Sequence, residues 1–319
     1  MSAGKYRPNT CVSAYEFFNR FPDQDTAQRH IEEIRWHGKP VCPFCGSEYV
    51  RLEPTTPGRY YRCYACGQRF TVRVGTIFHR SHIPLHKWLY AVYLVMASRK
   101  GISSVQLSKE LGITQKSAWF MLQRIRHALG RDDDDDPGNS GTFLREIVEV
   151  DEAYLGGKDE NRHECKRHHA GISDKTIVVG MRERNSGRTR GFVVGNTRSE
   201  TFAGLVFGTV EEGSVVCTDE SSAYAGIEGS YIRRAVNHSA KQYVDDMSYT
   251  NGIESFWAVL KRGFYGVFHW FSEKHTQRYV DEFAFRMHEG SCKKHMYQRI
   301  DAVLVGAFKK RLTYKALTV

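Results

Sequence analysis

Two Cys-x-x-Cys-Gly units constrain this chain more than any other feature of its sequence. Cys42 and Cys45 form the first unit, and Cys63 and Cys66 form the second. The glycine after each unit allows the tight turn that directs backbone amides at the thiolates. This spacing is typical of a zinc ribbon, and four thiolates complete a tetrahedral shell. The sequence therefore predicts a structural Zn²⁺ site, in preference to a redox pair.

The remaining cysteines do not form a disulfide framework. Cys11, Cys165, Cys217 and Cys292 are scattered along the chain, which is typical of a reduced, intracellular protein. The first residues contain no apolar signal-peptide core, and the longest apolar stretch, around residues 88–97, is too short to span a bilayer. We expect no membrane partner.

The charge balance favours a polyanionic partner. Lys and Arg total 46 against 36 for Asp and Glu, a formal net charge of +10. An excess of this kind speeds encounter with nucleic acid. Because a generic basic surface would give the same balance, charge alone does not decide the partner.

Changes in pattern along the chain predict five segments. Their order is an N-terminal helical segment, the zinc ribbon, a helix-turn-helix-like segment, an acidic linker containing five consecutive aspartates, and a catalytic domain. The predicted boundaries are residues 1–35, 36–80, 81–131, 132–142 and 143–319.

The third segment contains the helix start and stop signals of a helix-turn-helix. An apolar helix follows Pro84, a short helix runs to a turn at Gly112, and a second helix begins after Thr114 as N-cap. The second helix is predicted to present four side chains to a DNA groove, namely Gln115, Lys116, Gln123 and Arg124. An ordinary helical hairpin packed on its neighbours is the alternative.

From residue 143 onward, strands and helices alternate. Three consecutive strands are followed by a helix, a fourth strand, a short fifth strand and two further helices. This is the order of a ribonuclease-H-like domain. The predicted fold class is α/β, with a ribonuclease-H-like catalytic domain preceded by a zinc ribbon and a helix-turn-helix-like helical segment.

Acidic residues are predicted to meet at one edge of that sheet. Asp151 and Asp219 each end an apolar strand, and Glu254 begins a helix that can cross those strands. Three carboxylates of this kind can hold two Mg²⁺ or Mn²⁺ ions for phosphoryl transfer. Lys261 lies seven residues after Glu254, on the same helical face, where it can reach a phosphate.

Several neighbouring residues are weaker candidates. Strand alternation sends the acids adjacent to the two aspartates to the opposite face of the sheet; these are Glu149, Glu152 and Glu220. His238 follows the fifth strand and is a candidate DNA phosphate contact, although a surface role is as plausible.

Five segments together carry a resemblance: DEAYLGGK, TDESSAY, NHSAKQYV, TNGIESFWAVLKRG and RYVDEFAFRM. They resemble the DDE-type transposases of the insertion-sequence 1595 family, which begin with a zinc ribbon. The resemblance extends from about residue 15 to 310. It implies Asp151, Asp219 and Glu254 as the metal-binding acids and Lys261 as the basic residue. Because part of this family has Asn at the third position, Asn251 is a rival to Glu254.

The resemblance implies the function. We expect a transposase that binds terminal inverted repeats of double-stranded DNA, cleaves strands and transfers them to target DNA. Such an enzyme would be cytoplasmic and nucleoid-associated in a bacterium, and a homodimer or higher oligomer when two ends are paired. A non-catalytic DNA-binding regulator on a degenerate nuclease fold is the alternative, and a simple ribonuclease H or resolvase is a third.

Overall fold

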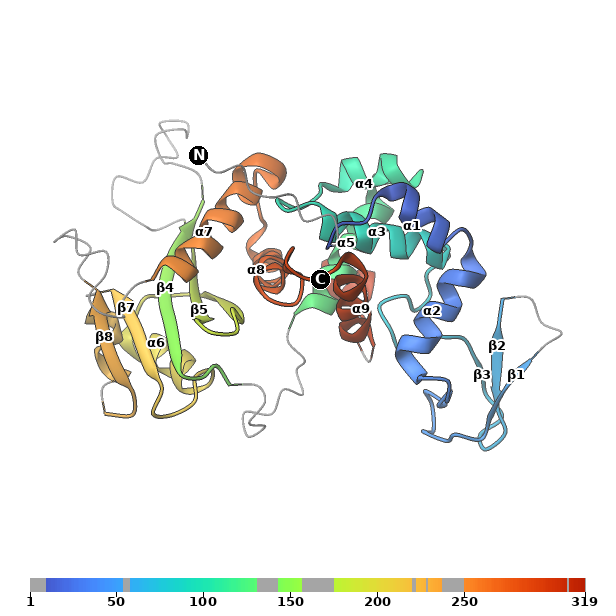
Figure 1. The fold of residues 1–319 in the computed structure, drawn as a ribbon, viewed down its shortest axis with the longest axis horizontal. Helices are drawn as coiled ribbons and strands as arrows, with labels where there is room; N and C mark the ends of the chain where they lie inside the picture. The colour runs from blue at the N-terminus through green and yellow to red at the C-terminus, as the bar shows by residue number, and fades with distance from the viewer. Residues whose placement is uncertain are drawn as a thin grey trace. The chain divides into compact units, whose positions relative to one another are not determined.

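The computed structural model describes residues 10–53, 58–130, 143–156, 175–219, 222–227, 229–236, 250–308 and 310–318. The chain forms two compact units (Figure 1). Unit 1 combines Met1–Gly130 with Glu289–Val319, and unit 2 is Arg131–His288. The sequence predicts one domain over 143–319, so the last thirty or so residues fold differently from that expectation.

Helices with clear capping residues build most of unit 1. Ser13 and Glu16 form a capping box at the first helix, and the Asp23 carboxylate accepts a hydrogen bond from the Thr26 amide at the second. The helices are α1 (Ala14–Arg20), α2 (Gln24–Trp36), α3 (Leu85–Ala97), α4 (Ser104–Leu111), α5 (Gln115–Leu129), α9 (Met296–Ala307) and α10 (Tyr314–Thr318).

The predicted turn between α4 and α5 is confirmed. Gly112 ends α4 in the left-handed conformation at φ 61°, and the Thr114 hydroxyl accepts a hydrogen bond from the Ser117 amide at 3.2 Å. These are the C-cap and N-cap of a helix-turn-helix connection.

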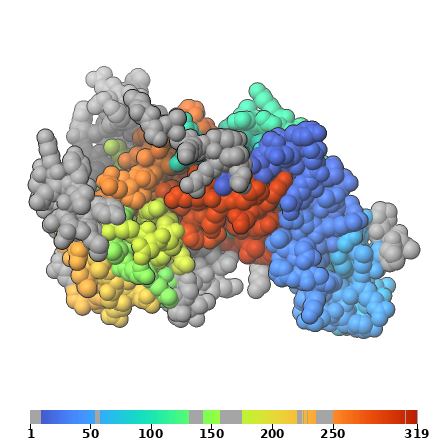
Figure 2. Space-filling view, in the orientation of Figure 1, coloured from blue at the N-terminus to red at the C-terminus, as the bar shows by residue number. Residues whose placement is uncertain are grey.

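The C-terminal helix α9 belongs to unit 1 because it packs on α2, α3 and α5. Buried Arg299 on α9 donates to the Met96 carbonyl oxygen at 3.0 Å, and Lys310 donates to the Gly130 carbonyl oxygen at 2.6 Å. In Figure 2 the red C-terminal residues lie against the blue N-terminal ones. These contacts join residues about 180 to 200 positions apart. Local sequence patterns therefore cannot predict them.

The zinc-ribbon region contains a small antiparallel sheet of β1 (Val50–Glu53), β2 (Tyr60–Cys63) and β3 (Arg69–Phe70). Its inner face packs on α2, where the Trp36 ring contacts the rings of Tyr61 and Phe70. The opposite face is exposed to solvent.

Unit 2 is built on a five-stranded mixed sheet in the order β6-β5-β4-β7-β8. Strands β4, β5 and β6 pair antiparallel, whereas β7 pairs parallel to β4 and β8 parallel to β7. The strands are β4 (Ile147–Leu155), β5 (Thr176–Glu183), β6 (Thr189–Val194), β7 (Val215–Asp219) and β8 (Ile232–Val236).

Helices cover both faces of this sheet. Helix α6 (Ser199–Phe207) and the 3-10 helix η4 (Ser222–Ile227) pack on Val148 and Val150, on one face. Helices α7 (Asn251–Gly263) and α8 (Glu273–Met287), with the π-helical turn η6 (Phe264–Phe268), pack on Ala153 and Leu155, on the other. Alternation along β4 thus assigns even-numbered residues to the α6 face and odd-numbered residues to the α7 face.

The strand prediction needs one correction. Strand β4 was expected to end at Asp151, but it continues to Leu155, because β5 pairs with it along its whole length. The predicted end of β7 at Asp219 is confirmed. None of the described helices combines the length and apolarity needed to cross a membrane.

Candidate metal centres

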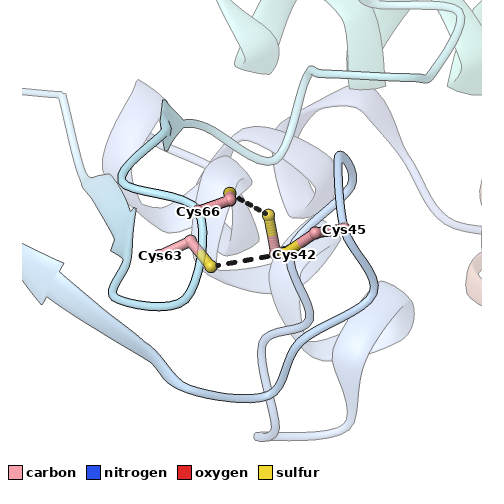
Figure 3. Close-up of side chains that lie close together, drawn as sticks. All are labelled: Cys42, Cys45, Cys63 and Cys66. Carbon is pink, nitrogen blue, oxygen red and sulfur yellow. Dashed lines mark hydrogen bonds between the residues drawn. The ribbon is translucent and has the colours of Figure 1, made fainter.

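The four cysteines of the two Cys-x-x-Cys-Gly units converge on one point (Figure 3). The Sγ atoms of Cys42 and Cys66 are 3.7 Å apart, and those of Cys45 and Cys63 are 3.6 Å apart. A tetrahedron with Zn–S bonds of about 2.3 Å has S–S edges of about 3.8 Å. The spacing therefore fits a Zn²⁺ ion held by four thiolates.

The two cysteine loops have the same backbone geometry. Gly46 and Gly67 adopt φ values of 73° and 75°, and each glycine amide donates to the carbonyl oxygen of the first cysteine of its unit. In each loop that first cysteine donates its own amide to the residue five positions later. The positive φ explains why both loops need glycine.

Backbone amides favour the thiolate form of Cys63, whereas at Cys45 and Cys66 burial and the neighbouring thiols outweigh the backbone hydrogen bonds and raise the pKa. A hydrogen bond from the Cys66 amide, supported by that of Ala65, lowers the pKa of the Cys63 thiol to about 6. Cys63 is fully buried, so a neutral thiol there would be inert, whereas a thiolate is a metal ligand. A closed four-thiolate shell leaves no open position, which is the arrangement of a structural site.

A second group of ligands lies in unit 2, where Asp151 and Asp219 sit on neighbouring parallel strands. The register pairs Glu149 of β4 with Cys217 of β7. Two residues further along both strands, the same register sets Asp151 beside Asp219 on the α7 face. Carboxylate oxygens of Asp151, Glu152 and Asp219 all lie within 4.8 Å of one another.

Glu152 is a member of this cluster that the sequence did not predict. Alternation does send Glu152 to the α6 face, where its carboxylate accepts a hydrogen bond from the Tyr224 hydroxyl at 2.7 Å. Its carboxylate oxygen nevertheless lies within 4.8 Å of those of Asp151 and Asp219. Excluding Glu152 by strand alternation was therefore wrong, because a long side chain can bring its carboxylate close to acids on the other face.

Helix α7 contacts the carboxylate cluster from the α7 face of the sheet. Its Trp257 donates a hydrogen bond from Nε1 to Asp151 Oδ2 at 2.9 Å. Burial raises the pKa of Asp151 to about 6, the charge of Glu152 adds to this, and the Trp257 bond opposes it. Burial likewise raises the pKa of Glu152. Crowded, partly buried carboxylates with raised pKa values are typical of sites that bind a cation.

The first turn of α7 is fixed by buried Glu149. One carboxylate oxygen accepts from the Ile253 amide at 2.8 Å, and the other accepts from Arg184 Nε at 3.1 Å. Gly252 is needed beside it, because a Cβ there would lie 2.6 Å from Glu149 Oε2 and 2.7 Å from Arg182 Nε. This contact sets the position of the helix that carries Glu254.

The remaining predicted acid lies outside the carboxylate cluster. Glu254 is exposed on the first turn of α7 and accepts a hydrogen bond from the Thr250 hydroxyl at 3.2 Å. It lies one turn before Trp257, the residue that contacts Asp151. Lys261, one turn after Trp257, is exposed, as is Asn251.

The predicted DNA-reading residues of α5 divide into two groups. Gln115 and Lys116, near its start, are exposed. Gln123 and Arg124 are buried, which contradicts the prediction that they face a groove. Arg124 donates to the carbonyl oxygens of Leu312 and His79, at 3.1 Å and 2.9 Å, so the C-terminal segment covers this part of the helix.

One further prediction falls outside the described residues. His238 lies in the segment 237–249.

Comparison with known proteins covers both metal centres. Residues 143–288 match the family model of the ISXO2-like transposase domain, and residues 22–69 match that of the transposase zinc-ribbon domain; both models are of the IS1595 type. The chain belongs to the IS1595 transposase family. The first match contains Asp151, Asp219, Glu254 and Lys261, and the second contains all four ribbon cysteines.

This IS1595 transposase is also similar to individual proteins. A protein in transposable element ISH50 of Halobacterium salinarum is 28% identical over 257 residues, which cover 76% of this chain and 83% of the relative. The crystal structure of the Mos1 Strand Transfer Complex matches at 9% identity, covering 63% of this chain and 76% of that chain, with a TM-score of 0.19. A TM-score at this level says nothing about the fold.

Proposed function

We propose that this chain is a DDE-type transposase whose unit 2 is a ribonuclease-H-like catalytic domain. The observation that carries the proposal is the convergence of Asp151 and Asp219 on the neighbouring parallel strands β4 and β7, with Glu152 within 4.8 Å. The strand order β6-β5-β4-β7-β8, with β4 central, supports the fold assignment. The transposase family supports the reaction class.

The carboxylates fit a hard divalent cation. Mg²⁺ and Mn²⁺ take oxygen ligands and share phosphate oxygens with a substrate. When bound, such ions supply activation of the attacking oxygen and stabilisation of the leaving oxygen. In our proposal Asp151 and Asp219 bind the cation, Trp257 orients the Asp151 carboxylate, and Tyr224 orients that of Glu152.

The chemistry follows from an in-line displacement at phosphorus. Water attacks the phosphodiester at the end of the element and releases a 3′-hydroxyl. That hydroxyl then attacks a phosphodiester of the target DNA. Both steps break one P–O bond and form another, so no redox partner is needed.

The third acid is proposed to be Glu254. It lies on α7 one turn from Trp257, the residue that contacts Asp151, and this supports the assignment. An ionised carboxylate binds Mg²⁺ better than an amide does, so Glu254 is preferred to Asn251. Glu152 is a second candidate because it is already close to both aspartates.

Lys261 is proposed to contact a substrate phosphate. It is exposed on α7, two turns after Glu254, and an ammonium is a compact point charge that suits phosphate. Gln115 and Lys116, exposed at the start of α5, are proposed to contact the terminal repeats.

The proposal is tested by cleavage of a labelled duplex that carries the terminal repeat found beside the gene. Asp151→Asn and Asp219→Asn should each abolish Mg²⁺-dependent cleavage while binding the duplex as the native chain does. Among the third-acid variants, Glu254→Gln should cost more activity than Asn251→Ala or Glu152→Gln. A chain that binds the repeat but never cuts it, with Mg²⁺ or Mn²⁺, would favour the non-catalytic regulator.

A further inference from the structure

The exposed face of the zinc-ribbon sheet carries a row of arginines. The cross-strand register pairs Arg51 of β1 with Arg62 of β2, and Arg62 with Arg69 of β3. Directly opposed residues of a sheet point to the same face. All three arginines are exposed, so the row crosses the full width of the sheet, about 10 Å at the usual strand spacing.

Tyrosines flank this row on the same face. Tyr49 precedes Arg51 by two residues, and Tyr64 follows Arg62 by two residues. Their rings are 5.3 Å apart and 58% and 51% exposed. The Arg51 guanidinium lies 5.7 Å from the Tyr64 ring centroid and 6.0 Å from that of Tyr49. These cation–π contacts orient the Arg51 side chain.

The charges of this face are only partly compensated. Glu53 accepts two hydrogen bonds from Arg69, at 2.8 Å and 2.5 Å. Among the described residues, no carboxylate lies within salt-bridge distance of Arg51 or Arg62. Like charges directly opposed across two strands destabilise a sheet, so an anionic partner would stabilise this one.

The inner face of the same sheet explains why the outer face stays exposed. Tyr61 and Phe70 are buried against Trp36 of α2, and the Tyr61 hydroxyl donates to buried Glu32 at 2.9 Å. The ribbon is therefore anchored by one face only. Tyr49, Arg51, Arg62 and Tyr64 of the outer face remain exposed.

We propose that this outer face, composed of Tyr49, Arg51, Arg62, Tyr64 and Arg69, binds the backbone of double-stranded DNA. Guanidinium groups form charge-assisted hydrogen bonds with phosphate oxygens, and exposed tyrosines contact sugar and phosphate without reading sequence. This inference rests on the proposed function for its DNA partner. It adds a second, sequence-independent contact surface to the α5 helix, and it accounts for the arginine row, which zinc binding alone does not require.

The test measures binding of the full-length, zinc-loaded chain to a fluorescein-labelled duplex of arbitrary sequence by fluorescence anisotropy across a salt series. Arg51→Gln/Arg62→Gln should weaken binding about tenfold and reduce the slope of log K against log salt by about 1.8, since each phosphate contact contributes about 0.9. The matched control is Arg29→Gln/Lys293→Gln, which removes the same charge from exposed positions outside the ribbon sheet and should change neither quantity appreciably.

Further variants separate this contact from misfolding and from catalysis. Arg51→Lys/Arg62→Lys should keep the native salt slope, and all variants should retain the zinc content of the native chain. The proposal is overturned if the glutamine variant binds within twofold of the control, if the lysine variant loses the salt slope, or if a single strand binds more tightly than the duplex through Tyr49 and Tyr64. No DNA strand is cut in this binding assay. A chain that lacks transposase activity could therefore still show the predicted loss of duplex binding in the glutamine variant.

Discussion

Trp257 of α7 donates a hydrogen bond to Asp151 of β4, with 2.9 Å between Nε1 and Oδ2. This single contact connects the helix that carries Glu254 and Lys261 with the central strand of the sheet. The bond also favours the ionised form of Asp151 and opposes the burial that raises the pKa of this carboxyl to about 6. In the proposed metal site it would therefore favour the form of the carboxylate that binds a cation.

Trp257→Phe should retain most of the packing and remove only the donor. Without that bond the pKa of Asp151 rises further, and protons compete better with metal at neutral pH. A hydrogen bond to a charged group is worth about 1.5–3 kcal/mol, so Mg²⁺-dependent activity should fall about tenfold or more. The matched control is Trp270→Phe, at a ring 70% exposed. Equal activity in the two variants would show that the bond has no role in the site.

Gly180→Ala should displace Trp257. Gly180 of β5 pairs with Asp151, and a Cβ at this position would lie 2.6 Å from Trp257 Cζ2 and 2.9 Å from Ile253 Cδ1. Overpacking of this kind costs about 1–3 kcal/mol of the free energy of unfolding. Urea denaturation should report the loss, whereas Gly195→Ala, which meets no atom within 4 Å, should remain close to the native chain. Unchanged stability in Gly180→Ala would contradict the packing described here.

Glu149→Gln should loosen the start of α7. Glu149 is buried, pairs with Arg184 and accepts the Ile253 amide. Removing its charge leaves a poorly exposed arginine without its carboxylate, at a cost of about 3 kcal/mol. Amide exchange over residues 251–263 should accelerate. Glu211→Gln, in the exposed pair with Arg145, should change stability by about 0.5 kcal/mol or less, and a similar effect in both variants would refute the anchoring role of Glu149.

The ribbon should require its zinc. We expect one Zn²⁺ per chain, and Cys63→Ser should abolish zinc binding and expose the amides of residues 41–70 to exchange, because four thiolates hold these two loops together. Unit 2 should be unaffected. Cys292→Ser changes an exposed cysteine outside the cluster and should keep the metal. Native chain purified without chelators and found free of zinc would contradict this site.

Local sequence signals predicted much of both metal centres. The repeated Cys-x-x-Cys-Gly pattern was sufficient for the ribbon, because glycine at positive φ and the following backbone bonds are local features. The helix caps at Gly112 and Thr114 were predicted for the same reason. Asp151 and Asp219 were found because apolar strands precede both.

Non-local contacts set the limits of prediction. Gln123 and Arg124 were predicted to face a groove, but both are buried, and Arg124 donates to the carbonyl oxygen of Leu312, 188 residues away. Glu152 was excluded by strand alternation, which gives the direction of a side chain but not how far its carboxylate reaches. Helix α9 joins unit 1 because it packs on α2, α3 and α5. Local sequence patterns do not predict this packing.

The central claim is that Asp219 and Asp151 hold the cation that drives strand cleavage. Asp219→Cys tests it directly, because a soft thiolate is a poor ligand for Mg²⁺ and a better one for Mn²⁺. The measurement is cleavage of labelled terminal-repeat duplex with each ion in turn. We predict native activity with both ions for the native chain, and for Asp219→Cys no activity with Mg²⁺ and partial recovery with Mn²⁺. Full Mg²⁺-dependent cleavage by Asp219→Cys would show that this carboxylate does not bind the catalytic metal.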